Sequence, residues 1–415
     1  MKEVNLRQFQ QSLVETFRRY LFTLNFISDN EQQLREAFWK CLLQPDVFHR
    51  EPLLSAIPAY QTAQSVNDLL ERSNLPRLHK NLARFPKDQF DTARPLYTHQ
   101  IESLRLVQDN RNVIVATGTG SGKTECFLLP VLDDALRHPG LGVRAIIIYP
   151  MNALANDQLA RLRKILKPLT EITFGRYTGD TPLDRNNISD EERAEILNPN
   201  ERFSRIEIRN QPPHILLTNF AMLEYLLLRP QDSDIFRQQR LRHVILDEAH
   251  TYNGAQGIEV GLLMRRLQQA FSNCPLQFIL TSATLGDDKS AIAEYGNRLT
   301  GAEFSEKDIV LGSPTPKFEA NLDDRVPLAE YVTAVPDSAT LDRWISAADD
   351  ETSLRSLIQK CGLRNSASAL HETSIQRVLY RWFERNAEMA SLYSAISQKP
   401  LPLSEAARRT WGIDS

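Results

Sequence analysis

One glycine-rich segment has the residue types that bind a chain of phosphates. The segment is Thr117-Gly118-Thr119-Gly120-Ser121-Gly122-Lys123-Thr124. It lies between a β-branched run at 113–116 and an apolar helical pattern at 125–134, which is the strand, loop and helix context of a P-loop. Glycines let successive backbone N–H groups turn toward phosphate oxygens, and the helix N-terminus attracts the same anion. We expect Lys123 to reach the β- and γ-phosphates of ATP and the Thr124 hydroxyl to bind Mg²⁺.

Two acidic residues follow a second β-branched run, at 243–246, in the segment Asp247-Glu248-Ala249-His250. Ligands of open α/β sheets bind at the carboxyl ends of the strands, which is where these acids stand. We expect Asp247 to hold Mg²⁺ and Glu248 to orient and deprotonate the water that attacks the γ-phosphate. Alone, the segment is equally well explained as a charged strand end before a helix; together with the glycine-rich loop it favours a nucleotide site.

Hydroxyl side chains end the next run, in Thr281-Ser282-Ala283-Thr284. A hydroxyl both donates and accepts, so it can exchange hydrogen-bond partners when the state of the nucleotide changes. We therefore predict that Ser282 and Thr284 are coupling residues rather than catalytic bases. His250, one step beyond the two acids, is predicted to be a third coupling residue that contacts this segment.

The segments that carry these residues alternate with helical segments along the chain. The β-branched runs lie at 113–116, 145–149, 173–177, 214–218, 243–246 and 277–281, with a last one at 309–311. This alternation predicts an α/β fold, in which a parallel sheet is covered by helices on both faces.

Both flanks of this region are predicted to be helical. Before it, apolar residues recur at helical spacing in Leu13-Phe17-Leu21 and in Leu34-Phe38-Leu42. Beyond Pro314, an apolar stripe that includes Trp382 and a second helical stretch at 403–411 suggest the start of a helix-turn-helix module. We expect a helical accessory region at 1–90, the α/β domain at 91–315, and a helical linker or the start of an accessory domain at 316–415.

Composition excludes several classes of protein. The 415 residues are 42% hydrophobic and 24% charged, which is typical of a folded globular protein, and no apolar stretch approaches the roughly 18 residues of a membrane span. The four cysteines are scattered singly and form no metal or disulfide pattern with the eight histidines. The net charge of −3 predicts that any nucleic-acid site is local. We expect a cytoplasmic protein that does not act at a membrane.

Residues 96–312 resemble the DEAD/DEAH-box helicases of superfamily 2, and within them the large bacterial MrfA-like helicases, which are related to the RecQ-like group. The resemblance rests on the glycine-rich loop, on Asp247-Glu248-Ala249-His250-Thr251-Tyr252, on Ser282-Ala283-Thr284 and on four further segments. These are Leu96-Tyr97-Thr98-His99-Gln100, Tyr149-Pro150-Met151-Asn152-Ala153-Leu154, Thr178-Gly179-Asp180 and Leu217-Thr218-Asn219. Thr117 departs from the strict P-loop pattern, as is common in this family. The resemblance implies a RecA-like P-loop NTPase domain.

The resemblance also implies further site residues. Gln100 would bind the adenine edge of ATP. The residues expected along the phosphates of a single nucleic-acid strand are Pro150, Asn152, Gln158, Thr178, Gly179, Thr218 and Asn219. Neutral hydroxyl, amide and backbone donors of this kind hold phosphate oxygens without reading the bases. Two alternatives stay open: Tyr252 stacks on a base or packs in the core, and the cations Arg161, Arg163, Lys164 and Lys167 attract the strand or form a solvated helix face.

The activity implied by the resemblance is ATP hydrolysis coupled to movement along one strand of nucleic acid, with DNA favoured, in DNA repair or phage defence. In this family, arginines of a second RecA-like domain complete the ATP site. No segment after residue 286 has their pattern, so we expect the second domain in a longer chain or in a partner, and little ATP hydrolysis by this chain alone. The alternatives are a translocase on double-stranded DNA, as in restriction or defence systems, and a nucleotide-binding scaffold.

Overall fold

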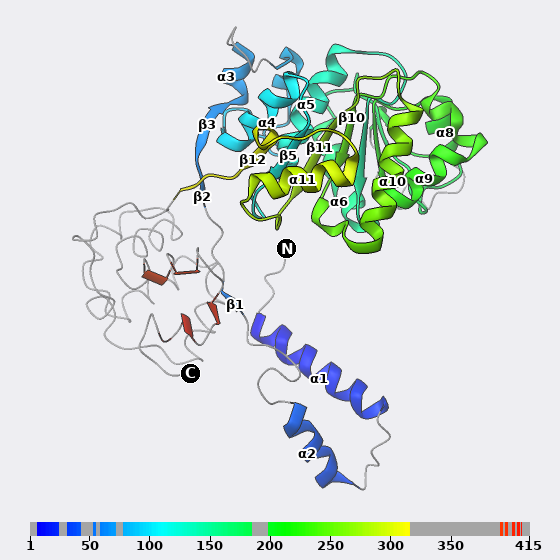
Figure 1. Cartoon of the computed structure of the whole chain (residues 1–415). Coiled ribbons are helices and arrows are strands. Elements are labelled where there is room, and N and C mark those ends of the chain that lie inside the picture. The colour runs from blue at the N-terminus through cyan, green and yellow to red at the C-terminus, as the bar shows by residue number, and fades with distance from the viewer. Residues whose placement is uncertain are drawn as a thin grey trace, which may run out of the picture. The chain divides into compact units, whose positions relative to one another are not determined.

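The computed structural model describes residues 6–24, 31–42, 53–54, 59–71, 78–184 and 198–315, with short pieces at 391–392, 395–396, 401–402, 405–406 and 408 (Figure 1). The chain divides into two compact units. One unit is Ile57–Thr315, and the other combines Met1–Ala56 with Pro316–Ser415.

One eight-stranded sheet forms the centre of the unit Ile57–Thr315, and every neighbouring pair of its strands is parallel. The strand order is β12 (Ile309–Leu311), β5 (Val113–Ala116), β11 (Gln277–Ser282), β10 (His243–Leu246), β6 (Ala145–Tyr149), β9 (Ile215–Asn219), β7 (Phe174–Arg176) and β8 (Glu201–Arg202). Parallel strands buried on both faces need nearly continuous apolar runs, and all residues of β6 and β10 are buried.

Alternate residues of each strand point to opposite faces and enter two separate cores. Val113 and Val115 pack in one core, whereas Ile114 between them packs in the other. The first core includes residues of α4 (Thr98–Gln108), α5 (Lys123–Arg137) and α6 (Asn152–Ile165). The second includes residues of α8 (Arg205–Asn210), α9 (Phe220–Leu228), α10 (Gly254–Ala270) and α11 (Lys289–Thr300). The predicted α/β fold, with a parallel sheet covered by helices on both faces, is confirmed (Figure 1).

Two short antiparallel strand pairs also belong to this unit. β2 (Ala59–Tyr60) pairs with β13 (Pro314–Thr315), and β3 (Thr62–Ser65) pairs with β4 (Pro95–Tyr97). The helix α3 (Val66–Glu71) and the 3₁₀ helix η1 (Lys80–Arg84) follow β3. The segment 59–90, which the sequence assigned to the helical accessory region, therefore begins with strands and belongs to the unit of the sheet.

The other unit contains the helices α1 (Leu6–Leu24) and α2 (Gln32–Leu42) and the antiparallel pair of β1 (Leu53–Leu54) with β14 (Leu401–Pro402). The apolar stripes predicted before the α/β region lie in α1 and α2. The apolar stripe around Trp382 and most of the stretch 403–411, on which the helix-turn-helix prediction rests, lie outside the described residues. Within the described residues, no helix combines the length and apolar character that crossing a bilayer requires.

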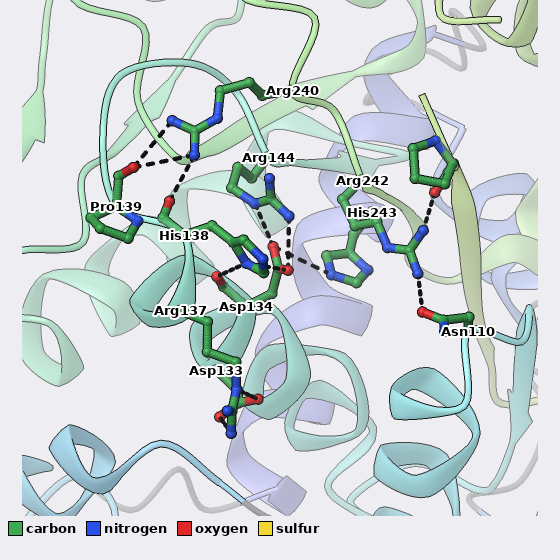
Figure 2. A network of polar contacts seen from close by, with 11 residues as sticks. Asn110, Asp133, Asp134, Arg137, His138, Pro139, Arg144, Arg240, Arg242 and His243 are labelled. Atoms are coloured by element: carbon green, nitrogen blue, oxygen red, sulfur yellow. Dashed lines mark hydrogen bonds and ion pairs between the residues drawn. The ribbon is translucent and has the colours of Figure 1, made fainter. Parts of the chain in front are cut away.

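Charged side chains form a network at the amino edge of the sheet, where Arg144 precedes β6 and Arg242 precedes β10 (Figure 2). Arg144 donates to both carboxylate oxygens of Asp134, at 2.6 and 2.8 Å. Burial on its own would raise the Asp134 pKa, but the hydrogen bonds from Arg144 and the nearby positive charges outweigh it and hold the pKa below its ordinary value. Burial lowers the pKa of His243, whose Nε2 is 3.7 Å from Asp134 Oδ2, to about 4. This edge of the sheet is a structural ion-pair network.

Candidate functional site

The glycine-rich loop connects β5 to α5 at the carboxyl edge of the sheet. Gly120 and Gly122 have φ angles of 74° and 73°, in the left-handed region that glycine adopts without strain. Gly122 is the N-cap of α5, and no side chain of the described residues caps it. The first N–H groups of α5 are thus placed to receive an anion at a helix start, which is the arrangement of a phosphate site.

Lys123 is buried in the first turn of α5 and contacts the loop itself. Its Nζ donates to the carbonyl oxygens of Thr117 at 3.1 Å and of Gly118 at 3.2 Å. The Thr117 hydroxyl shares a 2.6 Å hydrogen bond with that of Ser121. Both partners of Lys123 are neutral, so a phosphate group is a stronger partner for the same ammonium.

Helix α4 fixes the other side of the loop through two side chains. The Nε2–H of His99 donates to the Ser121 carbonyl at 2.8 Å, and burial lowers the pKa of this histidine. Gln100 accepts a hydrogen bond from the Tyr97 N–H at 2.8 Å and donates to the Gly122 carbonyl at 2.9 Å. Gln100 was predicted to bind adenine. It retains one N–H and one lone pair beyond these bonds, which is what a bidentate contact with a base edge requires.

The two predicted acids lie at the end of β10, and β11 separates this strand from β5. The Thr281 hydroxyl donates to Asp247 Oδ1, and the Glu248 N–H donates to the same oxygen at 3.1 Å. Burial raises the Asp247 pKa, and the Glu248 charge adds to this, while the bond from Thr281 and the Lys123 charge act against it. Because β5 and β10 are parallel and flank β11, the glycine-rich loop and the acids lie at the same edge of the sheet, one strand apart.

Glu248 has an unusual backbone for a non-glycine residue, with φ and ψ both at 48°. Its Oε2 is buried and accepts no hydrogen bond from any described residue, although His250 Nδ1 is 3.3 Å away. Strain together with an unsatisfied polar atom is characteristic of a functional position.

The predicted coupling residues connect to this carboxylate. His250 Nδ1 is 3.2 Å from the Ser282 hydroxyl, and the Thr284 N–H donates to that hydroxyl at 3.3 Å. The structure thus brings Glu248, His250 and Ser282 together in one chain of contacts, with Thr284 attached through its backbone.

The residues present fit a magnesium ion that is shared with phosphates. No group of three His, Cys, Asp or Glu side chains in the described part of the chain is arranged to hold a metal. Thr124, at the second position of α5, and Asp247 are the two predicted ligands. Mg²⁺ commonly uses one or two protein oxygens and completes its octahedron with phosphate and water, so this small donor set is sufficient.

The loops after β6, β7 and β9 are joined at the same edge of the sheet by side-chain amides. Asn219 Nδ2 donates to Asn152 Oδ1 at 2.7 Å, and Asn152 Nδ2 donates to Asp180 Oδ2 at 3.0 Å. Gly179, next to Asp180, is exposed. Three of the residues predicted to follow a nucleic-acid strand, Asn152, Gly179 and Asn219, are therefore brought together. Of the others, Pro150 and Gln158 are half-buried on either side of the start of α6.

Two threonines predicted to touch the strand do not reach the surface. Thr178 and Thr218 are fully buried, and the Thr218 hydroxyl donates to the Tyr177 carbonyl at 2.7 Å. The direct contacts expected of these two side chains are not supported by the structure. Thr218 lies in β9, between β6 and β7 in the sheet. Its hydroxyl holds Tyr177, at the start of the loop after β7, instead.

Packing decides the alternative for Tyr252 and gives two of the four cations near α6 an acidic partner. Tyr252 is buried, with its ring edge-to-face against Phe220 at 6.2 Å, so it packs in the core. Arg161 forms an ion pair with Glu125, and Arg163 forms a bidentate pair with the buried Glu201 at 2.8 and 2.9 Å. Lys164 and Lys167 are exposed.

One residue that the sequence did not reveal shapes the strand side of the site. The Arg205 guanidinium donates to the carbonyl oxygens of Thr178, Gly179 and Thr181, at 3.2, 2.9 and 2.9 Å. It also lies over the Tyr177 ring, 5.6 Å from its centroid. Arg205 stands in no motif, and its contacts are with residues more than twenty positions earlier in the chain, so no local pattern could have indicated it.

The chain is similar to known helicases over part of its length. A family model described as DEAD/DEAH box helicase matches residues 97–292. The chain is 31% identical over 394 residues to Druantia protein DruE of Escherichia coli strain UMEA 4076-1, an alignment that covers 70% of this chain and 21% of DruE. It is 32% identical over 210 residues to the uncharacterized ATP-dependent helicase YprA of Bacillus subtilis strain 168, covering 50% of this chain and 24% of YprA.

Among solved structures, helicase MrfA bound to DNA and AMPPNP is similar at 26% identity with a TM-score of 0.47, covering 64% of this chain and 32% of that chain. The chain thus spans less than a third of each of these relatives.

Proposed function

Because residues 97–292 are a DEAD/DEAH-box helicase domain, we propose that this chain supplies the ATP-binding half of a motor that moves along nucleic acid. The observation that carries the proposal is the convergence at the carboxyl edge of the sheet. The Thr281 hydroxyl donates to the Asp247 carboxylate there, and the Lys123 charge lowers the Asp247 pKa, beside the uncapped start of α5. A phosphate chain with a bound divalent cation would supply negative charge to Lys123 and positive charge to Asp247.

In the proposed nucleotide complex, Lys123 leaves the carbonyl oxygens of Thr117 and Gly118 for the β- and γ-phosphates. The N–H groups around Gly120 and Gly122 receive the remaining phosphate oxygens. Thr124 and Asp247 would hold Mg²⁺, which would offset the negative charge of the phosphates. Gln100 uses its remaining N–H and lone pair for the adenine edge.

Glu248 is the proposed base for the attacking water. Its carboxylate is held in a strained backbone position, with Oε2 not yet engaged by a hydrogen bond from the described residues. The contact from His250 to Ser282 offers a route by which a change at Glu248 reaches the strand end of β11. Charge that develops on the transferred phosphoryl group would be stabilised by arginines of a second RecA-like domain, in the same longer chain or in a partner.

We propose that the strand bound at this edge is single-stranded, and that DNA is the substrate to test first. Amide and backbone groups of Asn152, Gly179 and Asn219 support binding through phosphates, which is independent of base sequence. Pro150 and Gln158 are proposed to border the same path. Double-stranded DNA translocation and a scaffold role remain the competing proposals.

Equilibrium binding of ATP to the full chain, with and without Mg²⁺, tests the proposal. Lys123→Ala should weaken binding at least about tenfold, which corresponds to about 1.4 kcal/mol. The matched control is Lys164→Ala, because Lys164 is an exposed lysine of α6 outside the proposed site. Unchanged affinity in Lys123→Ala, or no dependence on Mg²⁺, would contradict the proposal.

The competing proposals separate in the complete protein. If Glu248→Gln leaves ATP turnover by the complete protein unchanged, the proposal of a nucleotide-binding scaffold replaces that of an ATP-driven motor. If ATP-driven movement on a duplex occurs with no displaced strand, the double-strand translocase replaces the single-strand helicase.

A further inference from the structure

Tyr60 lies in the first strand of the unit Ile57–Thr315 and next to its last strand. β2 and β13 pair with Tyr60 opposite Pro314, and the Gln61 N–H donates to the Ser313 carbonyl at 3.1 Å. On its other side, the Gln61 carbonyl accepts a hydrogen bond from the Thr98 N–H at 2.9 Å, at the start of α4. The backbone of Tyr60 is thus fixed between the end of the unit and the helix that carries Gln100.

The Tyr60 side chain points at the first turn of the glycine-rich loop and is almost completely buried. A Cβ atom on Gly118 would lie 2.9 Å from the Tyr60 hydroxyl. A Cβ atom on Gly312 would lie 2.5 Å from the Tyr60 ring and 3.1 Å from the Thr117 side chain. The ring therefore fills the space that two glycines leave open, one in the loop and one just after β12. Burial raises the Tyr60 pKa, and a hydrogen bond with the Gly118 backbone acts against it.

Two further aromatic rings fix the orientation of Tyr60. Its ring is edge-to-face with Tyr97, at 5.6 Å between centroids, and with His99, at 5.1 Å. Tyr97 and His99 are stacked at 5.4 Å. His99 in turn donates to Ser121 at the far end of the loop. The loop is therefore held at its Gly118 end by Tyr60 and at its Ser121 end by a ring that packs on Tyr60.

The end of the loop that Tyr60 contacts is also where Lys123 donates. The Thr117 and Gly118 carbonyls accept from Lys123, and both residues are within reach of the Tyr60 ring or its neighbour Gly312. For Lys123 to transfer to phosphates, this turn must keep its shape while it loses two hydrogen bonds. A rigid contact from outside the loop supplies that support at low entropic cost.

We propose that Tyr60 is a positioning residue for the phosphate loop, and that the β2–β13 pair exists in this unit to carry it. The inference rests on the proposed nucleotide site, which it extends by one residue outside every helicase motif quoted above. Tyr60 does not touch the phosphates. It acts through Gly118 and Thr117, and so sets the affinity for the triphosphate of ATP.

The test measures equilibrium binding of ATP and of ADP, each with Mg²⁺, to the full chain. Tyr60→Ala should weaken both about tenfold or more. Tyr60→Phe keeps the ring between Gly312, Tyr97 and His99 but loses the hydroxyl, and should weaken them about threefold, as expected for one hydrogen bond. Phe236→Leu is the control for general destabilisation, because Phe236 packs on Phe271 in the second core, at 5.4 Å, and contacts no part of the loop.

A second variant pair tests the route through Gly312. Gly312→Ala places a methyl group against the Tyr60 ring and should weaken ATP binding about tenfold in the otherwise unchanged chain. With Tyr60→Ala also present, the same change should cost only about threefold, because the ring it displaces is gone and only the 3.1 Å approach to the Thr117 side chain remains. The inference is overturned if the loss of ATP affinity in the double variant equals the product of the losses in Tyr60→Ala and Gly312→Ala. It is also overturned if Tyr60→Ala binds ATP as tightly as Phe236→Leu does. Absence of ATP binding by the unaltered chain would instead sink the proposed function, so the two failures are distinguishable.

Discussion

The two edges of the eight-stranded sheet both gather charged and polar side chains, and they differ in whether carboxylates are paired with arginines. At the amino edge, Arg144 pairs with Asp134 and Arg137 pairs with Asp133, while Arg240 donates to backbone carbonyl oxygens (Figure 2). At the carboxyl edge, Lys123 donates to neutral carbonyl oxygens, and Glu248 keeps an oxygen that no described residue satisfies.

The difference distinguishes a structural network from a site that takes a ligand. An anion at the amino edge would have to compete with the Asp133 and Asp134 carboxylates for their partly buried arginine partners, and separating such a pair is unfavourable. A phosphate chain at the carboxyl edge would replace two neutral partners of Lys123 and gain a charged one. A polar cluster is therefore not in itself evidence for a binding site. What matters is whether its charges are already paired.

The largest effect should come from neutralising one acid at each edge. Asp134→Asn leaves the partly buried Arg144 guanidinium without a counter-charge, and should lower the free energy of unfolding by about 2 kcal/mol. Asp247→Asn keeps an oxygen that accepts from the Thr281 hydroxyl and the Glu248 N–H, so it should change the free energy of unfolding by less than about 1 kcal/mol. Urea unfolding of the full chain measures both. Equal destabilisation would remove the distinction between the edges.

The same two substitutions should respond to pH with opposite signs. The Asp134 pKa is held below its ordinary value, so the stability this carboxylate contributes is present above about pH 4 and is lost as pH falls through the folded pKa. The cost of Asp134→Asn should therefore shrink at acid pH. The Asp247 pKa is raised, so its ionised form is penalised above the folded pKa, and any gain from Asp247→Asn should disappear as pH falls. Parallel pH profiles for the two variants would contradict this assignment.

Glu248 should show that the carboxyl edge gives up stability for function. Glu248→Gly relieves the left-handed backbone and should raise the free energy of unfolding by about 1 kcal/mol relative to Glu248→Gln, which keeps the strain. Both substitutions should abolish ATP hydrolysis by the complete protein, because both remove the proposed base. The comparison fails if Gly and Gln give equal stability.

The carboxyl edge could be predicted from the sequence, because the central strands are visible there as β-branched runs; the ion-pair network of the amino edge was not predicted. β5, β6, β10 and β12 match the predicted runs residue for residue, and the predicted ends of β7, β9 and β11 are within one residue. Strands buried on both faces have to be continuous apolar runs, so they are visible without knowledge of their neighbours. The motifs at their ends were then placed on one edge by topology alone.

What could not be predicted depends on partners far away in the chain. β3 is the polar segment Thr62–Ser65, and β8 contains Glu201, whose burial is possible because Arg163 pairs with it. Neither has the pattern of a strand. Arg205 and Tyr60 likewise act through contacts with loops that the sequence does not bring near them. The burial of Thr178 and Thr218 follows from their position beside other strands, which a motif does not encode.

The smallest expected effect comes from a substitution of the buried Thr218, on the side of the site proposed to bind the nucleic-acid strand. Thr218→Val removes the hydroxyl that donates to the Tyr177 carbonyl and should lower the free energy of unfolding by about 0.5 to 1 kcal/mol. It should leave binding of single-stranded DNA within about twofold, since the side chain is not at the surface. Asn219→Ala should weaken strand binding several-fold through the loss of its link to Asn152, and should lower the free energy of unfolding by about 1 kcal/mol because Asn219 Oδ1 also accepts from the Met222 N–H as the N-cap of α9. Fluorescence anisotropy with a labelled oligonucleotide measures both, at two salt concentrations because phosphate contacts depend on salt. If Thr218→Val weakened binding as much as Asn219→Ala, the hydroxyl would have to reach the strand in the bound state, and the loop after β7 would have to open when DNA arrives.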